Sequence, residues 1–379
     1  MPARTKATVA KRGPVPRALG PLIAEVRSLI RSARYAAAST VNTLQVLTNF
    51  EIGRRIVEHE QKGEKRAGYG QELLKELSAH LSEEFGKGFS VSNLQLMRKF
   101  FIENPSRIQQ KPSVELASFD VDPKASDPLL PVRIAQTPSG NLRTPFTLSW
   151  SHYVLLLTIK DPGERSFYEI EATSEGWSLP ELKRQKTACL YERLALSRGK
   201  KAVRKLAVEG QIITGPADIL KKPYVLEFLG LDEKSEYSES DLETAIISRL
   251  EQFLLELGKG FLFEARQKRF TFDEDHFYVD LVFYNRLLRC YVLIDLKLDK
   301  LTHQDLGQMQ MYVNYYDRKV KLPRENPTIG ILLCKRKKDA IVELTLPPDA
   351  NIHAKEYKLY LPSKAELKRK LLEWGDAQV

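Results

Sequence analysis

The sequence has 379 residues, of which 42% are hydrophobic and 28% are charged. This length is enough for two domains, and the composition excludes collagen, a fully disordered chain and a disulfide scaffold. Lysine and arginine number 59 against 49 aspartates and glutamates, a formal net charge of +10. Such an excess favours a polyanionic partner such as nucleic acid. No stretch approaches the roughly 18 uninterrupted apolar residues of a membrane helix, so no membrane partner is expected.

The three cysteines, Cys189, Cys290 and Cys334, lie far apart and form no C-x-x-C pair. Their spacing argues against a zinc ribbon, and their odd number argues against a disulfide framework. The basic N-terminus lacks the apolar core of a secretory signal. We therefore expect a reduced, cytoplasmic compartment.

Residues 1–20 carry five basic residues and no acid, which predicts a disordered basic arm that either touches phosphate or is an inert solvated tail. The apolar residues that follow have the i, i+3, i+4, i+7 spacing of one buried helix face: Leu22, Ile23, Val26, Leu29 and Ile30. Further helices are expected over 39–57 and 71–85.

A glycine-containing turn at 86–88 separates the helix over 71–85 from a next helix over 93–101, which Ser90 or Ser92 caps. This pattern is typical of a helix-turn-helix or winged-helix domain. Any antiparallel helix pair shows it too, so plain bundle packing is the alternative. Under the first interpretation, Asn93, Arg98 and Lys99 bind nucleic acid.

Residues 104–145 contain seven prolines and predict a long loop. Helical patterns return over 150–159 and 180–198. These signals place a helical, DNA-binding N-terminal domain at 21–205, with the Pro-rich loop inside it. Two prolines and an acidic run then predict a linker at 206–239.

The sequence patterns of the C-terminal part predict elements in the order α-β-β-β-α-β, which is typical of a mixed sheet with flanking helices. The expected elements are a helix over 241–257, strands over 261–272, 277–284 and 290–296, a helix over 305–316 and a strand over 329–334. We place this domain at 240–362, followed by a basic helix or tail at 363–379.

Two strands of this domain carry acidic residues. One apolar set with period two (Phe277, Val279, Leu281 and Phe283) leaves Asp280 on the other side of its strand, and Asp295 and Lys297 share a face of the next strand. A hairpin then brings Asp280 close to Asp295. Like charges on neighbouring strands repel unless a cation lies between them, and Mg²⁺ prefers such carboxylates.

A lysine beside such an ion can orient or help deprotonate its water, so the pattern suits metal-assisted phosphodiester hydrolysis. The alternative is a solvated Asp295–Lys297 pair on an exposed strand face. Leu293, Ile294 and Leu296 surround this pair with apolar residues, which favours a site at the end of a core strand.

Three segments, FYVDLVFY at 277–284, VLIDLK at 292–297 and GQMQMY at 307–312, resemble the C-terminal domain of the YhcG-like family of PD-(D/E)XK nucleases. The first half resembles the family's helical N-terminal domain through the segments at 68–70, 84–90, 148–152 and 190–193. The resemblance covers about residues 20–362. The resemblance implies a restriction-endonuclease-like αβββαβ fold and hydrolysis of DNA that depends on Mg²⁺ or Mn²⁺. It also suggests structure-specific cleavage or a role in recombination or defence.

Carried over one residue at a time, the resemblance implies that Asp280 and Asp295 hold the metal and that Lys297 is the catalytic lysine. A glutamate on the first core helix completes the metal shell; Glu256 is the choice and Glu251 the alternative. Gln308 and Tyr312 match a Q-x-x-x-Y element and share one helix face.

Gln267 either reaches the site and the nucleic acid or makes structural hydrogen bonds. Val279 departs from the family's nominal proline. His276 and His303 are not needed by this chemistry.

Two rival functions stay open: an inactive nucleic-acid-binding or scaffold protein on the same fold, and a nuclease that acts on RNA. The intact Asp280, Asp295 and Lys297 argue against the inactive form. A homo-oligomer is suggested only by analogy with enzymes that cut both strands.

Overall fold

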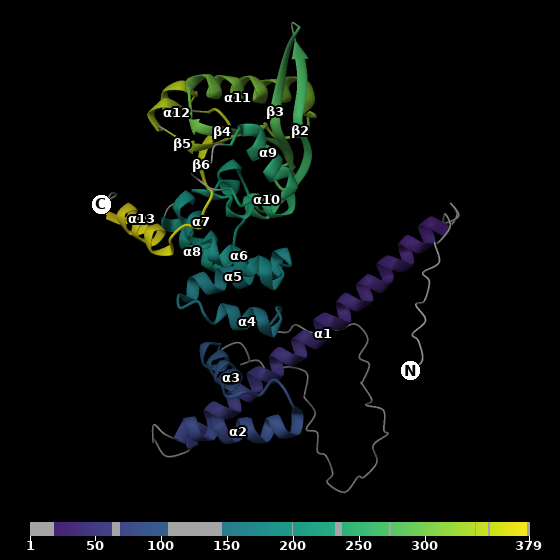
Figure 1. Cartoon of the computed structure of the whole chain (residues 1–379), viewed down its shortest axis with the longest axis vertical. Coiled ribbons are helices and arrows are strands. Elements are labelled where there is room, and N and C mark those ends of the chain that lie inside the picture. Colours follow the sequence, from purple (N-terminus) through teal and green to yellow (C-terminus); the bar gives the residue numbers. More distant parts are fainter. Residues whose placement is uncertain are drawn as a thin grey trace, which may run out of the picture. The chain divides into compact units, whose positions relative to one another are not determined.

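The computed structural model describes residues 19–62, 69–104, 146–198, 200–231, 237–272, 274–337, 339–347 and 349–376. The expected basic arm and Pro-rich loop lie outside this part, apart from residues 19, 20 and 104. The chain forms two compact units, Met1–Leu157 and Thr158–Val379 (Figure 1). This division falls inside the N-terminal domain expected at 21–205, so the helices after residue 157 belong to the same unit as the sheet. No helix of the described part is long and apolar enough to cross a membrane.

The first unit is helical throughout its described residues, with no strand that could form a wing. Its helices are α1 (Leu19–Lys62), α2 (Tyr69–Phe85), α3 (Val91–Glu103) and α4 (Trp150–Leu156). Aromatic rings make the core: Phe50 of α1 and Phe100 of α3 both contact Phe146, with ring centroids 5.5 and 4.9 Å away. The glycine turn and the Ser90 cap of α3 are confirmed, since the Ser90 side chain accepts a hydrogen bond from the Asn93 N–H.

The first helix differs from its prediction in two ways. It is one helix of 44 residues where two were expected. Of the face expected to be buried near its start, Val26, Leu29 and Ile30 are exposed, at 44%, 70% and 46%, and the side chains of Leu22 and Ile23 lie outside the described part. Among the side chains described on α1, the buried ones fall between residues 46 and 56. Apolar spacing predicts an amphipathic face but not whether a neighbour covers it.

Gly53 explains how closely α1 packs against α3. A Cβ at this position would lie 2.1 Å from the backbone oxygen of Met97. Any larger residue would therefore push the two helices apart.

The second unit begins with four helices, α5 (Pro162–Glu175), α6 (Leu179–Thr187), α7 (Leu190–Arg198) and α8 (Lys200–Glu209). The single helix expected over 180–198 is two helices, because Cys189 adopts a φ of +53° between them. The expected C-terminal helix is present as α13 (Lys364–Asp376), and its Leu367 packs against Cys189 and Leu196.

A six-stranded mixed sheet forms the rest of this unit, in the order β1-β6-β5-β4-β3-β2. Its strands are β1 (Tyr224–Val225), β2 (Phe261–Phe272), β3 (Asp275–Asn285), β4 (Cys290–Lys300), β5 (Ile329–Arg336) and β6 (Ile352–Lys358). The four predicted strands are confirmed. The linker expected at 206–239 is wrong in part, because β1 lies within it, is buried, and pairs with β6.

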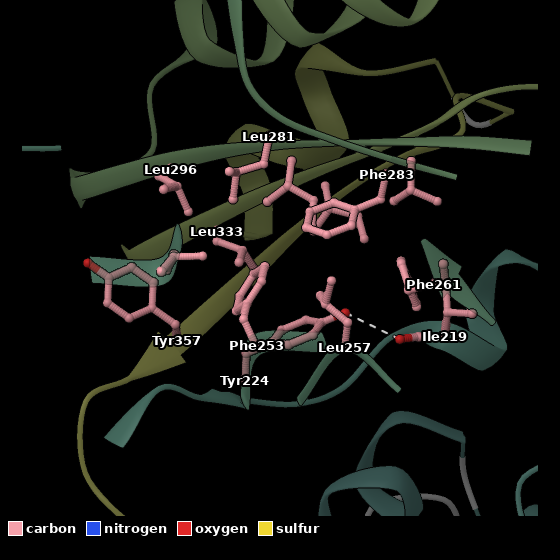
Figure 2. Close-up of a cluster of buried hydrophobic side chains, with 14 of the residues drawn as sticks. Ile219, Tyr224, Phe253, Leu257, Phe261, Leu281, Phe283, Leu296, Leu333 and Tyr357 are labelled. Atoms are coloured by element: carbon pink, nitrogen blue, oxygen red, sulfur yellow. Dashed lines mark hydrogen bonds between the residues drawn. The ribbon is translucent and has the colours of Figure 1, made fainter. Parts of the chain in front are cut away.

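Helices cover both faces of the sheet. The helix expected over 241–257 is two, α9 (Glu239–Ser248) and α10 (Leu250–Leu257), which break at Arg249. Figure 2 shows Phe253 and Leu257 of α10 packed among side chains of the strands, including Leu281, Leu296 and Leu333. On the opposite face lie α11 (His303–Tyr315), the π-helical turn η3 (Tyr316–Val320) and α12 (Asp339–Thr345). Two short 3-10 helices, η1 (Pro216–Ile219) and η2 (Glu227–Leu229), flank β1.

The apolar set expected on one side of β3 is split. Leu281 and Phe283 belong to the cluster that α9 and α10 cover, whereas Phe277 and Val279 pack in the cluster beneath α11. The change occurs at Asp280, where β3 leaves β4 and continues with β2 alone.

Candidate active site

Asp280 sits where the ladder between β3 and β4 ends. The last paired residues are Leu281 and Ile294, and one further step would place Asp280 opposite Asp295. Beyond this last pair, Asp280 contacts β4 through its side chain: its Oδ2 accepts a hydrogen bond of 2.9 Å from the Leu296 N–H. The end of strand pairing therefore brings the two predicted carboxylates together.

Asp295 is buried, with 3% of its surface exposed. Burial, and next the neighbouring Asp280 carboxylate, raise the pKa of Asp295 to about 7. Two acids this close cannot both ionise cheaply without a nearby cation. The pair therefore retains a proton near neutral pH.

Lys297 supplies one positive charge to this pair. Its Nζ lies 3.0 Å from Asp295 Oδ2 and 3.4 Å from Glu239 Oε2. Burial lowers the pKa of Lys297, but Asp295, Glu239 and Asp280 together raise it above its usual value. Lys297 is therefore charged at neutral pH, and it suits orienting a group or stabilising negative charge better than accepting a proton.

Gln267 joins a third carboxylate to the site. It lies between the paired residues Arg266–Leu281 and Lys268–Val279, beside Asp280, with a φ of +46°. Its side-chain amide donates to Asp280 Oδ1 at 2.9 Å and to Glu243 Oε2 at 2.5 Å. These hydrogen bonds place Gln267 beside Asp280, and its contact with nucleic acid stays a prediction. Positive φ at such a residue is an uncommon backbone state that clusters at functional sites.

Glu243, which is buried on α9, is the site residue that sequence reasoning missed. The available signal was the i, i+4 spacing of Glu239 and Glu243, which places both on one face of the first core helix. Glu239 contacts Lys297 through its side chain and the Leu298 N–H through its Oε1.

The assignment of Glu256 to the metal is wrong. Glu256 is fully buried on α10, and its carboxylate accepts hydrogen bonds from Arg193, Arg184 and the Val225 N–H. Burial raises its pKa, but Arg193, Lys221 and Arg184 outweigh burial and lower the pKa of Glu256 to about 2. Both oxygens are thus occupied by cationic partners that tie α6 and α7 to the sheet.

Glu251, the alternative to Glu256, is exposed in the first turn of α10. It lines a polar cavity of about 230 Å³ together with Glu171, Lys259 and Lys221. Nothing in its surroundings connects it with Asp280 and Asp295.

Tyr312 and Gln308 share one face of α11, as their spacing predicts. The Gln308 amide donates to the Tyr312 hydroxyl. Tyr312 is fully buried with its ring edge-on to Phe270, 5.5 Å between centroids. Burial, and then the nearby Asp295 and Asp280 charges, raise the pKa of Tyr312, so its hydroxyl stays protonated close to the carboxylates.

The three residues expected to bind DNA in the first unit are engaged within that unit. Asn93 Oδ1 accepts from Trp150 Nε1 at 3.1 Å. Arg98 pairs with Glu60 at 2.7 Å, and Lys99 Nζ donates to the Leu157 carbonyl oxygen at 2.6 Å. These contacts fit bundle packing, and DNA contact by these residues stays a prediction.

The carboxylates suit a hard divalent cation. No group of three or more His, Cys, Asp or Glu in the described residues is placed to hold a metal ion together. Mg²⁺ needs none, because it binds one or two carboxylates and keeps several waters. Asp280 and Asp295 provide that donor set, and an ion bound there would replace the proton that the raised pKa of Asp295 retains. His276 lies on the β2–β3 hairpin and His303 at the start of α11, and neither joins these carboxylates.

Known proteins resemble this chain along most of its length. Residues 217–372 match the model of the YhcG PDDEXK nuclease domain, and residues 25–193 match the DUF1016 N-terminal domain. A protein of Escherichia coli (strain K12) named "Putative nuclease YhcG" is 42% identical over 346 residues, which is 91% of each chain. The crystal structure of a repair endonuclease from Pyrococcus abyssi is similar over 34% of this chain and 50% of its own, with 19% identity and a TM-score of 0.22.

Proposed function

The chain belongs to the YhcG family of PDDEXK nucleases, and from that premise we propose that it hydrolyses phosphodiester bonds of DNA with a divalent metal ion, Mg²⁺ or Mn²⁺. One observation carries the proposal: Asp280 and Asp295 form a carboxylate pair at the end of the β3–β4 ladder, with Lys297 Nζ 3.0 Å from Asp295. Two carboxyl groups lie beside one fixed cation, and the pKa of Asp295 is raised to about 7, which is the arrangement expected of a metal-assisted phosphoryl-transfer site.

Asp280 and Asp295 would hold the ion, and Glu243 would fix the Gln267 amide that donates to Asp280. When bound, such an ion supplies a water of lowered pKa and neutralises charge on a phosphoryl oxygen. The protein's own part is orientation. The Leu296 N–H and the Gln267 amide each hold one oxygen of Asp280, which fixes the direction of the carboxylate.

Lys297 acts as a positive charge beside the scissile phosphate and the attacking water. Because its neighbours keep it protonated, it stabilises the negative charge that develops in the transition state. Tyr312 and Gln308 are positioning residues, since the buried Tyr312 hydroxyl lies close to the carboxylates and is held by Gln308.

We assign the protein to the cytoplasm. All three cysteines are buried and unpaired, which fits a reducing compartment.

The test is a cleavage assay on the purified full chain. Linear, nicked, branched and single-stranded DNA, and RNA, are incubated with Mg²⁺ or Mn²⁺ and with a chelator. We expect metal-dependent cleavage of DNA that the chelator abolishes. Cleavage of RNA alone would replace DNA by RNA as the substrate, and binding without cleavage of any substrate would favour the inactive scaffold.

A further inference from the structure

Beyond the carboxylates, β2 and β3 continue without β4 as a two-stranded ribbon of residues 267–272 and 275–280, which projects past the other strands (Figure 1). One side of the ribbon packs on α11. Phe270 stacks on Tyr315 with 4.1 Å between ring centroids, and Phe277 and Val279 join the same cluster. These contacts fix the ribbon against the body of the unit.

The opposite side of the ribbon is exposed and polar. Arg269 lies directly opposite Tyr278, and Thr271 lies opposite His276. Arg269 lies 2.9 Å from His276 Nε2, and the Thr271 hydroxyl lies 3.0 Å from His276 Nδ1. We call the side formed by Arg269, Thr271, His276 and Tyr278 the ribbon face.

Tyr278 presents its ring to solvent on this face. It is 45% exposed, and within the described part of the chain it stacks on no other ring. Arg269, held by His276, lies beside it. An exposed aromatic ring next to a guanidinium is a common platform for the base and phosphate of single-stranded nucleic acid.

The ribbon face leads directly into the catalytic carboxylates. Tyr278 lies on the side of β3 away from Val279, which packs towards α11, and it comes two residues before Asp280. Two residues of a strand span about 7 Å. On β2, Gln267 lies two residues before Arg269, and its side-chain amide donates hydrogen bonds to Asp280 and Glu243.

We propose that the ribbon face holds an unpaired nucleotide beside the scissile phosphate, with Tyr278 stacked on the base and Arg269 bound to the neighbouring phosphate. In an intact duplex the faces of the bases are stacked on one another, so a side chain reaches them only where a base is unpaired or flipped out. The substrate class is therefore DNA with a single-stranded or branched segment at the cut. This inference rests on the proposed function, because it places the nucleotide beside a phosphate that the site cuts. The binding of the nucleotide itself does not require cleavage.

The exposed acids Glu274 and Asp275 lie at the turn between β2 and β3, next to His276. They repel a phosphate backbone that continues past His276. The face is thus long enough for one or two nucleotides, which makes it a local clamp next to the site.

The experiment measures binding of the full chain to single-stranded, forked and duplex DNA of equal length, by fluorescence anisotropy with chelator present. We expect Tyr278→Ala to weaken binding of single-stranded and forked DNA by about tenfold and to leave duplex binding unchanged. Tyr278→Phe should keep the wild-type affinity, because stacking needs the ring and not the hydroxyl. The matched control is Tyr360→Ala, since Tyr360 is 47% exposed and follows β6; it should change nothing.

A second pair of variants tests the phosphate contact. Arg269→Ala should lower the slope of log affinity against log salt by about one on forked DNA. Arg286→Ala, an exposed arginine in the turn at the other end of β3, should leave the slope unchanged.

Equal losses on duplex and forked DNA, no loss in Tyr278→Ala, or the same loss in Tyr278→Phe would each overturn the proposal. Its failure is separable from failure of the nuclease assignment. A protein that never cleaves but shows the Tyr278 pattern refutes only the proposed activity, and one that cleaves without that pattern refutes only the ribbon face.

Discussion

Two buried carboxylate sites in the second unit differ in how their charge is balanced. Glu256 is surrounded by Arg193, Arg184 and Lys221, which hold its pKa at about 2. Asp295 lies against another carboxylate with Lys297 alone nearby, and its pKa is raised to about 7. A balanced buried charge ties elements together, whereas an unbalanced one stores free energy that a cation releases on binding. The contrast separates a structural from a functional acid.

The largest expected effect is loss of cleavage when the unbalanced pair is neutralised. Asp280→Asn and Asp295→Asn should each bring metal-dependent hydrolysis down to background while DNA binding is kept, because both are proposed to hold the ion. Cleavage rate and anisotropy are measured on the same samples. Wild-type cleavage by either variant would remove that residue from the site.

Neutralising the balanced acid should instead damage the fold. Glu256→Gln leaves Arg193 and Arg184 without their buried partner, and breaking such a pair costs about 3–5 kcal/mol of unfolding free energy. Urea denaturation followed by circular dichroism measures this. The matched change Asp295→Asn should leave the fold as stable or more stable, since it relieves repulsion. A larger loss of unfolding free energy in Asp295→Asn than in Glu256→Gln would contradict the distinction between the two acids.

Lys297→Met keeps most of the aliphatic stem and removes the charge. We expect a slowing of about 10²-fold or more under saturating substrate, as for loss of a transition-state contact. Its melting temperature should change little, because the pair of Lys297 with Glu239 lies at the surface and Asp295, whose pKa is already raised, can take up a proton when the lysine charge is lost. Normal cleavage would reduce Lys297 to a solvated partner of Asp295, and unfolding would make it structural.

The raised pKa of Asp295 predicts how stability depends on pH. Because its folded value, about 7, lies above its unfolded value, the stabilisation is complete below about pH 4 and is lost as pH rises through about 7. Metal-free protein should therefore lose stability between about pH 4 and 7 and level off above that, and Asp295→Asn should flatten this trend. Mg²⁺ should stabilise the wild type more at pH 8 than at pH 6, because binding releases the shared proton. Thermal melts at several pH values test both statements.

The smallest effect concerns the first unit. Deleting residues 1–20, or changing Arg98 and Lys99 to Ala, should each lower the salt slope of DNA binding by about one for every lost phosphate contact. Lys370→Ala on α13 serves as the control. An unchanged slope in both would leave this unit as a packing or protein-interaction module, as the contacts of Arg98 with Glu60 and Lys99 with Leu157 suggest.

Local patterns predicted the part of the site that lies on neighbouring strands. Asp280, Asp295 and Lys297 follow from strand period and hairpin pairing, and the structure places them together. The prediction of Glu256, with Glu251 as the alternative, overlooked Glu243 for lack of local information. Glu256 and Glu243 both lie on apolar helices, and they differ in their partners. Glu256 binds Arg193, which is 63 residues away in the sequence, whereas Glu243 binds Gln267, which lies opposite Asp280.

The same reason explains the misses in the fold. The strands β1 and β6 pair with each other across more than 130 residues, and β1 has only two residues, too few for a period. Apolar spacing at the start of α1 predicts a buried face, because such a pattern depends only on which residues are hydrophobic. It does not show whether another element packs against them. The exposed Leu29 and Val26 of α1 show the difference.

Mn²⁺ binding is the most direct test that the Asp280–Asp295 pair is a metal site. Calorimetric titration compares the wild type with Asp295→Asn, Glu243→Gln and Glu256→Gln. The account predicts binding by the wild type, loss in Asp295→Asn, weakening in Glu243→Gln, and wild-type affinity in whatever folded Glu256→Gln protein is obtained. Unchanged Mn²⁺ binding in Asp295→Asn would contradict it.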